Sequence, residues 1–177
     1  MSDETSNVSG KPALSPEEAR KAAAATEAMA ATFGRVVALL IASPRHRKLK
    51  LEDVGTMLMP AIALGQYAVV GAKAQKDGPV SIAAAVWWAF VSPEVDKRLS
   101  ESRDEFLKLS ASEWNCGDLP WVIEAIGEQK ILNEMVKRIA SRKFKGKPAK
   151  LRALMPDGKV AVGSLEPSKP GAPKQPG

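Results

Sequence analysis

The chain has 177 residues, of which 45% are hydrophobic, and it carries a formal net charge of +6. This length supports one domain with a hydrophobic core and is short for two. The single cysteine excludes an intrachain disulfide, and one cysteine with one histidine excludes a zinc site built mainly from those residue types. The positive charge favours an acidic partner: nucleic acid, an anionic membrane surface or an acidic protein.

The N-terminal region is expected to contain a disordered leader followed by a long helix. Residues 1–14 are mostly polar and show no hydrophobic period, which is typical of disorder. Ser15 is a good N-cap, and Glu18 stands at capping-box spacing from it. The helix is expected to run to about residue 41 and to end before Pro44, because the residue before a proline disfavours the α conformation.

The rest of the chain alternates helical and strand-like segments. In chain order we expect a helix at 51–65, strands at 66–74 and 79–92, a helix at 92–102, a buried strand at 119–127, a helix at 128–144 and a strand hairpin within 149–166. From residue 167 the tail is rich in proline and glycine and is expected to be disordered. This order predicts an α+β fold with a mostly antiparallel sheet flanked by helices, in a single domain over residues 15–166.

No secretory signal is visible in the polar N-terminal residues. The apolar run Val36–Ala42 is too short to span a bilayer. We therefore expect a soluble cytoplasmic protein without stable membrane insertion.

The only histidine, His46, lies between Arg45 and Arg47 with Lys48 close behind. It is the only side chain whose unperturbed pKa lies near neutrality, so it is the first candidate for an acid or base. The alternative is a histidine in a solvated basic loop, since general-base function needs a partner that spacing cannot establish.

Two further candidates lie in the segment SEWNCGDLPWVIEAIG. Asp118 immediately precedes the apolar strand, where a carboxylate is well placed to orient a base or meet a cation. The alternative is a turn aspartate that accepts backbone hydrogen bonds beside a glycine. Cys116 has the chemistry of a nucleophile, although a lone cysteine is more often packed.

Three short motifs, in order, resemble those of the toxin-activating lysine acyltransferases, bacterial enzymes that mature RTX protoxins. They are Ser43-Pro44-Arg45-His46-Arg47, then Pro60-Ala61-Ile62 with Gln66-Tyr67, then Trp114-Asn115-Cys116-Gly117-Asp118 followed by Trp121. Their order and spacing agree over about residues 33–165. The chain departs from the family in an alanine-rich strand before residue 92, and in lacking a second tryptophan and a proline after Glu124.

The resemblance implies a GCN5-type N-acetyltransferase-like fold and transfer of a fatty acyl group from acyl carrier protein to lysine ε-amines of an RTX-type protoxin. It assigns catalytic roles to His46, Asp118 and Ser43, and a weaker substrate-binding role to Tyr67. No resident cofactor or metal is implied, because the donor is the 4′-phosphopantetheine thioester of the carrier protein. The family also suggests a homodimer.

The basic residues then acquire an expected partner, because acyl carrier proteins are strongly acidic. Candidate docking residues are Arg45, Arg47, Lys48 and Lys50, and a second basic run comprises Arg142, Lys143, Lys145, Lys147, Lys150 and Arg152. An apolar slot for the acyl chain is expected near Trp87, Trp88, Phe90 and Trp121, whose alternative place is the ordinary core.

The mechanism is expected to use neutral His46 to deprotonate the acceptor lysine, with Arg45 and Arg47 lowering the histidine pKa and Asp118 opposing them if it lies nearby. An acyl-enzyme route through Ser43 or His46 is the competing mechanism. The competing function is a non-enzymatic basic binding module. Against nucleic acid as its ligand, the basic runs carry almost no aromatic residues for base stacking.

Overall fold

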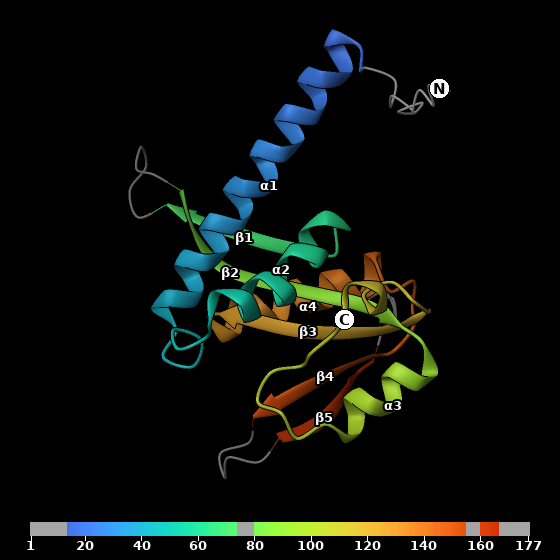
Figure 1. Ribbon diagram of the computed structural model, residues 1–177. Coiled ribbons are helices and arrows are strands. Elements are labelled where there is room, and N and C mark those ends of the chain that lie inside the picture. Colours follow the sequence, from blue (N-terminus) through green and yellow to red (C-terminus); the bar gives the residue numbers. More distant parts are fainter. Residues whose placement is uncertain (1–13, 74–79, 155–159, 167–177) are drawn as a thin grey trace, which may run out of the picture.

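A computed structural model describes residues 14–73, 80–154 and 160–166 (Figure 1). The elements are α1 (Pro16–Ala42), α2 (Leu51–Ala63), β1 (Tyr67–Lys73), β2 (Val80–Val91), α3 (Pro93–Glu101), a short 3₁₀ turn (Ala111–Glu113), β3 (Leu119–Gly127), α4 (Gln129–Arg142), β4 (Ala149–Leu154) and β5 (Val160–Leu165). This order of helices and strands is the one predicted from the sequence. The expected leader and tail and the two hairpin turns lie outside the described residues, except for Leu14.

The five strands form one sheet in the order β1-β2-β3-β4-β5. Neighbouring strands are antiparallel except β3 and β4, which run parallel. The helix α4 supplies the crossover that a parallel pair requires. The mixed α+β fold with a mostly antiparallel sheet is therefore confirmed, and it is consistent with an N-acetyltransferase-like architecture.

Side chains on the two faces of the sheet pack into two separate hydrophobic clusters. On one face, residues of α1, α2 and α3 pack against Trp87 of β2 and Trp121 of β3. On the other face, α4 packs against Trp88 of β2 and Val122 of β3. Because the strands alternate their side chains between two covered faces, β2 and β3 read as nearly continuous apolar runs.

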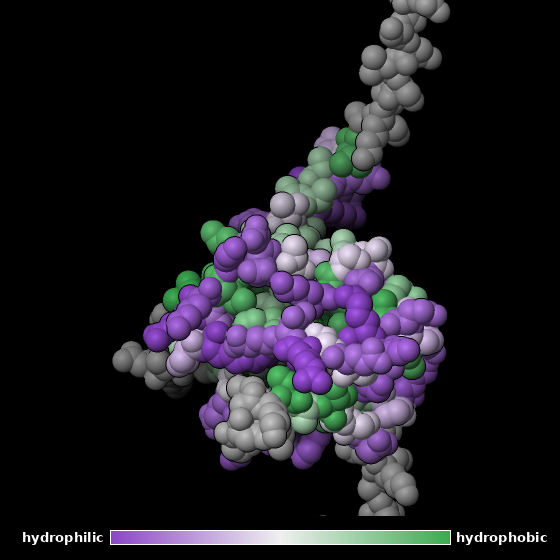
Figure 2. Space-filling model, turned by 60° about the horizontal axis from the view of Figure 1, so that its bottom comes forward, coloured by the Kyte–Doolittle hydropathy of each residue, from purple (hydrophilic) through white to green (hydrophobic). Residues whose placement is uncertain are grey.

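The first helix begins as its sequence predicts. Ser15 accepts a hydrogen bond from the Glu18 amide and Glu18 caps the Ser15 amide, which completes the capping box. Only the last turns pack on the body, where Val36 and Leu40 are buried. Residues 16–28 are all exposed, and this part of the helix projects from the molecule (Figures 1 and 2).

The length and composition of α1 would allow it to cross a membrane, with an 18-residue window of mean hydropathy 1.5 that is 11% buried. The sequence expectation considered only the run Val36–Ala42 and so missed this wider apolar stretch. Core helices of soluble proteins and N-terminal signal sequences pass the same test, so one such helix is weak evidence of a membrane span. The apolar window by itself therefore does not assign α1 to a membrane.

Two irregularities of β3 shape the centre of the molecule. Against β2, Trp87 pairs with Glu124 and Trp88 with Val122, so Ile123 is an extra residue, a β-bulge. Against β4, pairing is limited to Trp121–Lys150 and Val122–Leu151. Beyond Val122 the two strands are unpaired, and the gap between them opens beside the bulge.

Candidate functional site

The site begins in the tight turn that ends α1. The Ser43 carbonyl accepts hydrogen bonds from the amides of both His46 and Arg47. This turn stops the helix at Pro44, as the sequence predicts, and folds the His46 ring back toward the sheet. The residue is only 5% exposed, so the solvated-loop alternative for His46 is wrong.

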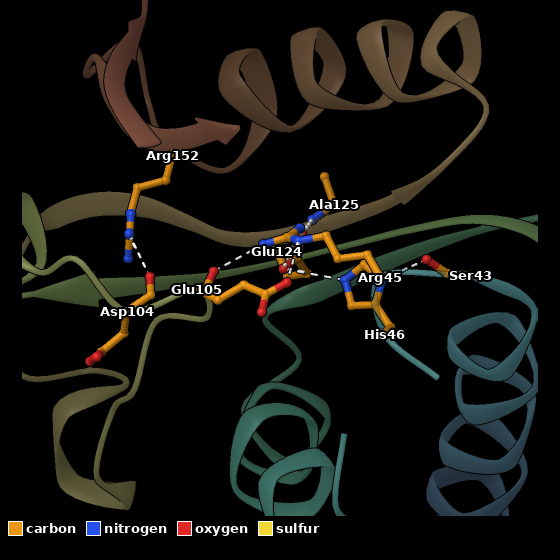
Figure 3. A network of polar contacts seen from close by, with 8 residues as sticks. All are labelled: Ser43, Arg45, His46, Asp104, Glu105, Glu124, Ala125 and Arg152. Atoms are coloured by element: carbon orange, nitrogen blue, oxygen red, sulfur yellow. Dashed lines mark hydrogen bonds and ion pairs between the residues drawn. The ribbon is translucent and has the colours of Figure 1, made fainter. Parts of the chain in front are cut away.

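Both ring nitrogens of His46 face polar side chains (Figure 3). Nδ1 lies 2.7 Å from Ser43 Oγ, within hydrogen-bonding distance. Nε2 lies 3.4 Å from Oε2 of Glu124, within ion-pairing distance but without hydrogen-bond geometry. The ring also packs against Phe106, with centroids 5.3 Å apart. His46 Nε2 is therefore a buried atom that makes no hydrogen bond with the described residues.

Glu124 is a carboxylate inside the protein, 9% exposed. A buried charge is costly unless it is paired, and here Arg45 Nη1 lies 3.1 Å and 3.2 Å from its two oxygens. The Ala125 amide also donates to Oε1 at 3.1 Å. Arg45 in turn contacts Glu105 and stacks 4.6 Å from the Phe106 ring centroid. The carboxylate is thus fixed in place next to His46.

The β-bulge explains why Glu124 points toward His46. In a regular strand Ile123 and Glu124 would face opposite sides of the sheet. Here Ile123 belongs to the cluster under α1 and α2, and Glu124 contacts Arg45 and His46 of the turn that follows α1. The side chain of Ala125 packs toward α4 instead. One extra residue therefore brings a carboxylate to the histidine.

A pocket of about 470 Å³ lies in the gap between β3 and β4. Its walls are Val122, Ile123, Glu124 and Ala125 of β3, the α4 face from Gln129 to Lys137, Leu151, Arg152 and Ala153 of β4, and Arg45, Glu105, Leu107 and Leu165. Glu124 and its partner Arg45 border the pocket, so a molecule held there lies against this buried charge pair.

Asp118 lies elsewhere. Its side chain is 76% exposed and forms an ion pair with Lys147, which lowers the pKa of the Asp118 carboxyl below its ordinary value through hydrogen bonding and charge attraction. Six residues of extended strand, about 20 Å, separate it from Glu124. The sequence left open whether Asp118 contacts His46; in the described structure it does not, and the carboxylate at His46 belongs to Glu124.

The motif that contains Asp118 has a structural role. Trp114 is buried in the core, and the segment up to Gly117 pairs with β2 through Phe90. A Cβ at Gly117 would lie 2.3 Å from the Val91 carbonyl oxygen, so only glycine fits there. The exposed Cys116 thiol donates to the Glu113 carbonyl and accepts from the Ser92 amide.

The expected docking cations divide into two groups. Arg47 and Lys48 are exposed, whereas Arg45 forms ion pairs with Glu124 and Glu105. In the second basic run, three side chains make contacts inside the protein: Lys147 with Asp118, Lys150 with Asp96, and Arg152 with the Asp104 carbonyl. The partners of these three residues are distant in sequence, so the contacts could not be predicted from the basic run alone.

The aromatic residues expected near an acyl slot pack within the two cores instead. Trp87, Trp88 and Trp121 are 0–2% exposed within the two cores, and Phe90 packs edge-on against Phe144. None of the four lines the pocket beside Glu124. Tyr67 is half-buried against the core at the start of β1.

Glu124 is the site residue that the sequence reasoning missed. The available signal was a glutamate inside the apolar strand LPWVIEAIG, because an uncompensated charge in a buried strand needs a partner. The identity of that partner depends on the bulge and on a turn 79 residues away.

Comparison with known proteins gives two findings. The sequence model of the RTX toxin acyltransferase family matches residues 25–162. Uncharacterized protein sll0720 of Synechocystis sp. is 29% identical over 131 residues, which cover 73% of this chain and 84% of that protein.

Proposed function

Since the chain belongs to the RTX toxin acyltransferase family, we propose that it transfers a fatty acyl group from acyl carrier protein to internal lysine ε-amines of an RTX-type protoxin. The observation that carries this proposal is the buried His46–Glu124 pair, whose Glu124 carboxylate lines the pocket between β3 and β4. Two acceptor atoms 3.4 Å apart in a buried site favour binding of a cationic or amine group.

The proposed acceptor complex places the lysine nitrogen between His46 Nε2 and Glu124 Oε2. An ammonium group has three donors and would satisfy both atoms at once. Lysine has a reference pKa of about 10.4, so most of it is protonated at neutral pH and needs a base before it can attack. Neutral His46 takes the proton, and the Glu124 carboxylate stabilises the imidazolium that results.

Ser43 and Arg45 position these two groups. If Nδ1 carries the imidazole proton, it donates to Ser43 Oγ and leaves the Nε2 lone pair free for the acceptor amine. Arg45 holds the Glu124 carboxylate with two hydrogen bonds, which orients it toward the ring. In this mechanism Arg45 is a positioning residue and not a docking cation.

The donor thioester is proposed to enter the pocket between β3 and β4. The phosphopantetheine arm is part of the carrier substrate, so the protein needs no resident cofactor. The exposed cations Arg47 and Lys48 follow His46 directly, and they are the proposed docking residues for the acidic carrier protein.

The same Ser43–His46 hydrogen bond supports a competing route. If Ser43 donates to Nδ1, the histidine acts as base for the serine hydroxyl, and an acyl-serine intermediate precedes transfer to lysine. Intact-mass analysis after mixing with acyl-carrier protein alone separates the routes. An acyl mass gain on the wild-type protein that disappears in Ser43→Ala supports the acyl-serine intermediate. A wild-type protein of unchanged mass supports direct transfer.

The function is tested by coexpression with acyl carrier protein and with the candidate protoxin encoded beside this gene. We expect the protoxin to gain the mass of a fatty acyl group on lysine, and His46→Ala to abolish that gain. Cys116→Ser is the matched control and should retain it, because the thiol of Cys116 contacts only backbone groups among the described residues. No mass gain with wild type would contradict the proposal, and salt-sensitive DNA binding would favour the binding-module alternative.

We further propose that the protein works in the cytoplasm, where the acidic carrier is found, and that it forms a homodimer. The exposed alanine-rich first half of α1 is the proposed contact surface.

A further inference from the structure

Three cationic side chains line the pocket between β3 and β4, and they differ in their counterions. Arg45 is neutralised by Glu124, and Lys137 lies 3.3 Å from Glu134. Arg152 has no carboxylate within ion-pairing distance among the described residues, and among them its side chain donates only one hydrogen bond, from Nη2 to the Asp104 carbonyl at 2.6 Å. In the described part of the chain, Arg152 is therefore the cation of this pocket that lacks a direct ion pair.

The free donors of Arg152 are buried. Nε and Nη1 are shielded from solvent and have no hydrogen-bond partner among the described residues. Burial of guanidinium nitrogens without a partner is costly, and such groups are rare in native proteins unless a ligand, an ion or water completes them. Burial also lowers the pKa of Arg152, and Arg45 adds to this effect while Asp104 and Glu124 oppose it.

Arg152 lines the same pocket as Glu124, the partner of His46. It extends from β4 on the far side of the gap from Glu124, and both residues line the same pocket (Figure 3). Arg152 donates to the carbonyl of Asp104, and Arg45 donates to the carbonyl of the next residue, Glu105, so both arginines are anchored on neighbouring residues of one loop.

We propose that Arg152 is a catalytic residue that donates hydrogen bonds to the acyl carbonyl oxygen of the donor as that oxygen becomes negative. This proposal rests on the proposed acyltransferase function and adds a role for a residue opposite the base. His46 acts on the acceptor nitrogen, while Arg152 acts on the donor oxygen.

His46 takes one proton from the lysine ammonium, and the neutral amine forms a bond to the thioester carbon while the C=O electron pair moves to oxygen. The tetrahedral intermediate loses a second nitrogen proton to solvent. When the oxygen pair returns, the C–S bond breaks and the thiolate takes the proton held by His46. The products are an amide, a free carrier thiol and one released proton.

An arginine without a direct ion pair suits this role for an electrostatic reason. The thioester in the ground state is neutral, so it gains little from the cation. The tetrahedral oxygen carries a full charge, so the interaction strengthens on the way to the transition state, which is the condition for accelerating the reaction. A guanidinium already paired with a carboxylate, as Arg45 is, would give less.

The test compares Arg152→Gln, Arg152→Lys, Arg152→Ala and the surface control Arg138→Gln, an exposed arginine of α4. With purified acyl-carrier protein and the acceptor, we expect Arg152→Gln to lower kcat by about 10²- to 10³-fold, the usual effect of losing one oxyanion donor. KM for the carrier should stay within about threefold. Arg152→Lys should keep part of the activity, and added methylguanidinium should restore part of it to Arg152→Ala.

Each contrary outcome has a distinct meaning. A raised KM with unchanged kcat would replace the proposal with a contact to the phosphate or the carrier protein. Full activity of Arg152→Gln beside an active wild type would overturn the catalytic role and leave the proposed function standing. Loss of thermal stability in both Arg152→Gln and Arg152→Lys without methylguanidinium rescue would make Arg152 structural. An inactive wild type would instead contradict the proposed function itself.

Discussion

At the residue scale, the central feature is a carboxylate that is buried and yet fully engaged. Glu124 meets Arg45, His46 and the Ala125 amide, so the cost of its burial is offset by charge-assisted hydrogen bonds. Such a group is rigid, and rigidity is what a proton-transfer site needs. The exposed Asp118 has one charged partner, Lys147, and is open to screening by salt.

We therefore expect substitution of the two carboxylates to affect the rate of acyl transfer very differently. Glu124→Gln keeps the shape of the side chain but removes the charge, so acyl transfer should fall by about 10²- to 10⁴-fold. Asp118→Asn should change the rate by less than about threefold, because solvent screens exposed ion pairs. Initial rates of acceptor acylation measure both. A large loss in Asp118→Asn with an active Glu124→Gln would support the catalytic role of Asp118 that the family resemblance implies.

The pH dependence of stability gives a second residue-scale prediction. The folded-state pKa of Asp118 is lowered by Lys147 from its ordinary value of 3.8. Its stabilising contribution is therefore fully present above that ordinary value and is lost as pH falls through the lowered value. Thermal unfolding of wild type and Asp118→Asn should differ by a constant small amount from pH 5 upward, and the difference should shrink in stronger acid. If the stability difference between wild type and Asp118→Asn grew as pH falls, the expected pH dependence would be contradicted.

At the scale of elements, two short backbone features decide where the functional groups lie. The bulge at Ile123 turns Glu124 to the face of the turn after α1. The segment Trp114–Gly117 pairs with β2 and sets the point where β3 enters the sheet. Both features act through the backbone, and neither needs a reactive side chain.

The close contact at Gly117 can be tested by stability alone. Gly117→Ala puts a Cβ 2.3 Å from the Val91 carbonyl oxygen, so it should destabilise the fold by about 1–3 kcal/mol as overpacking does. The matched control is Gly34→Ala in α1, where a Cβ meets nothing within 4 Å. Because alanine is the better helix residue, the control should stabilise by about 0.5–1 kcal/mol. Urea unfolding should therefore show shifts of opposite sign, and equal shifts would refute the close approach.

At the scale of the whole molecule, the gap between β3 and β4 connects the two sides of the sheet. The turn after α1 supplies Arg45 to the pocket wall and places His46 against Glu124, while α4 and β4 form other walls of the pocket. The proposed acceptor approaches the histidine and the proposed donor fills the pocket, so the two substrates meet at Glu124. The projecting α1 stands apart from this arrangement (Figure 1).

The exposed half of α1 carries the prediction on assembly. The purified full chain should have the mass of a dimer by light scattering. Ala24→Glu with Ala28→Glu places two charges on one face of the helix and should give a monomer, because burial of unpaired charge is costly. Ala24→Ser with Ala28→Ser is the matched control and should remain dimeric. A monomeric wild type, or a dimer that survives both charges, would contradict the proposed contact.

Local signals in the sequence were enough to predict the helices and strands of this protein and their order. Capping residues, prolines and hydrophobic periods are local signals, so the start of α1 at Pro16, its end at Ser43 and the central strand at Leu119–Gly127 could all be predicted. The sequence motifs also indicated His46 and the family. These properties depend on residues that are close in the sequence, so they can be predicted without knowing the fold.

The tertiary structure alone decided which charges meet. Glu124 reaches Arg45 across 79 residues, Lys150 reaches Asp96 across 54, and Lys147 reaches Asp118 across 29. A one-residue bulge reverses the face of Glu124, and such an insertion leaves no local signature in an apolar strand. Electrostatic pairing depends on distance in space and on burial, so the partner of His46 could be identified only in the folded chain.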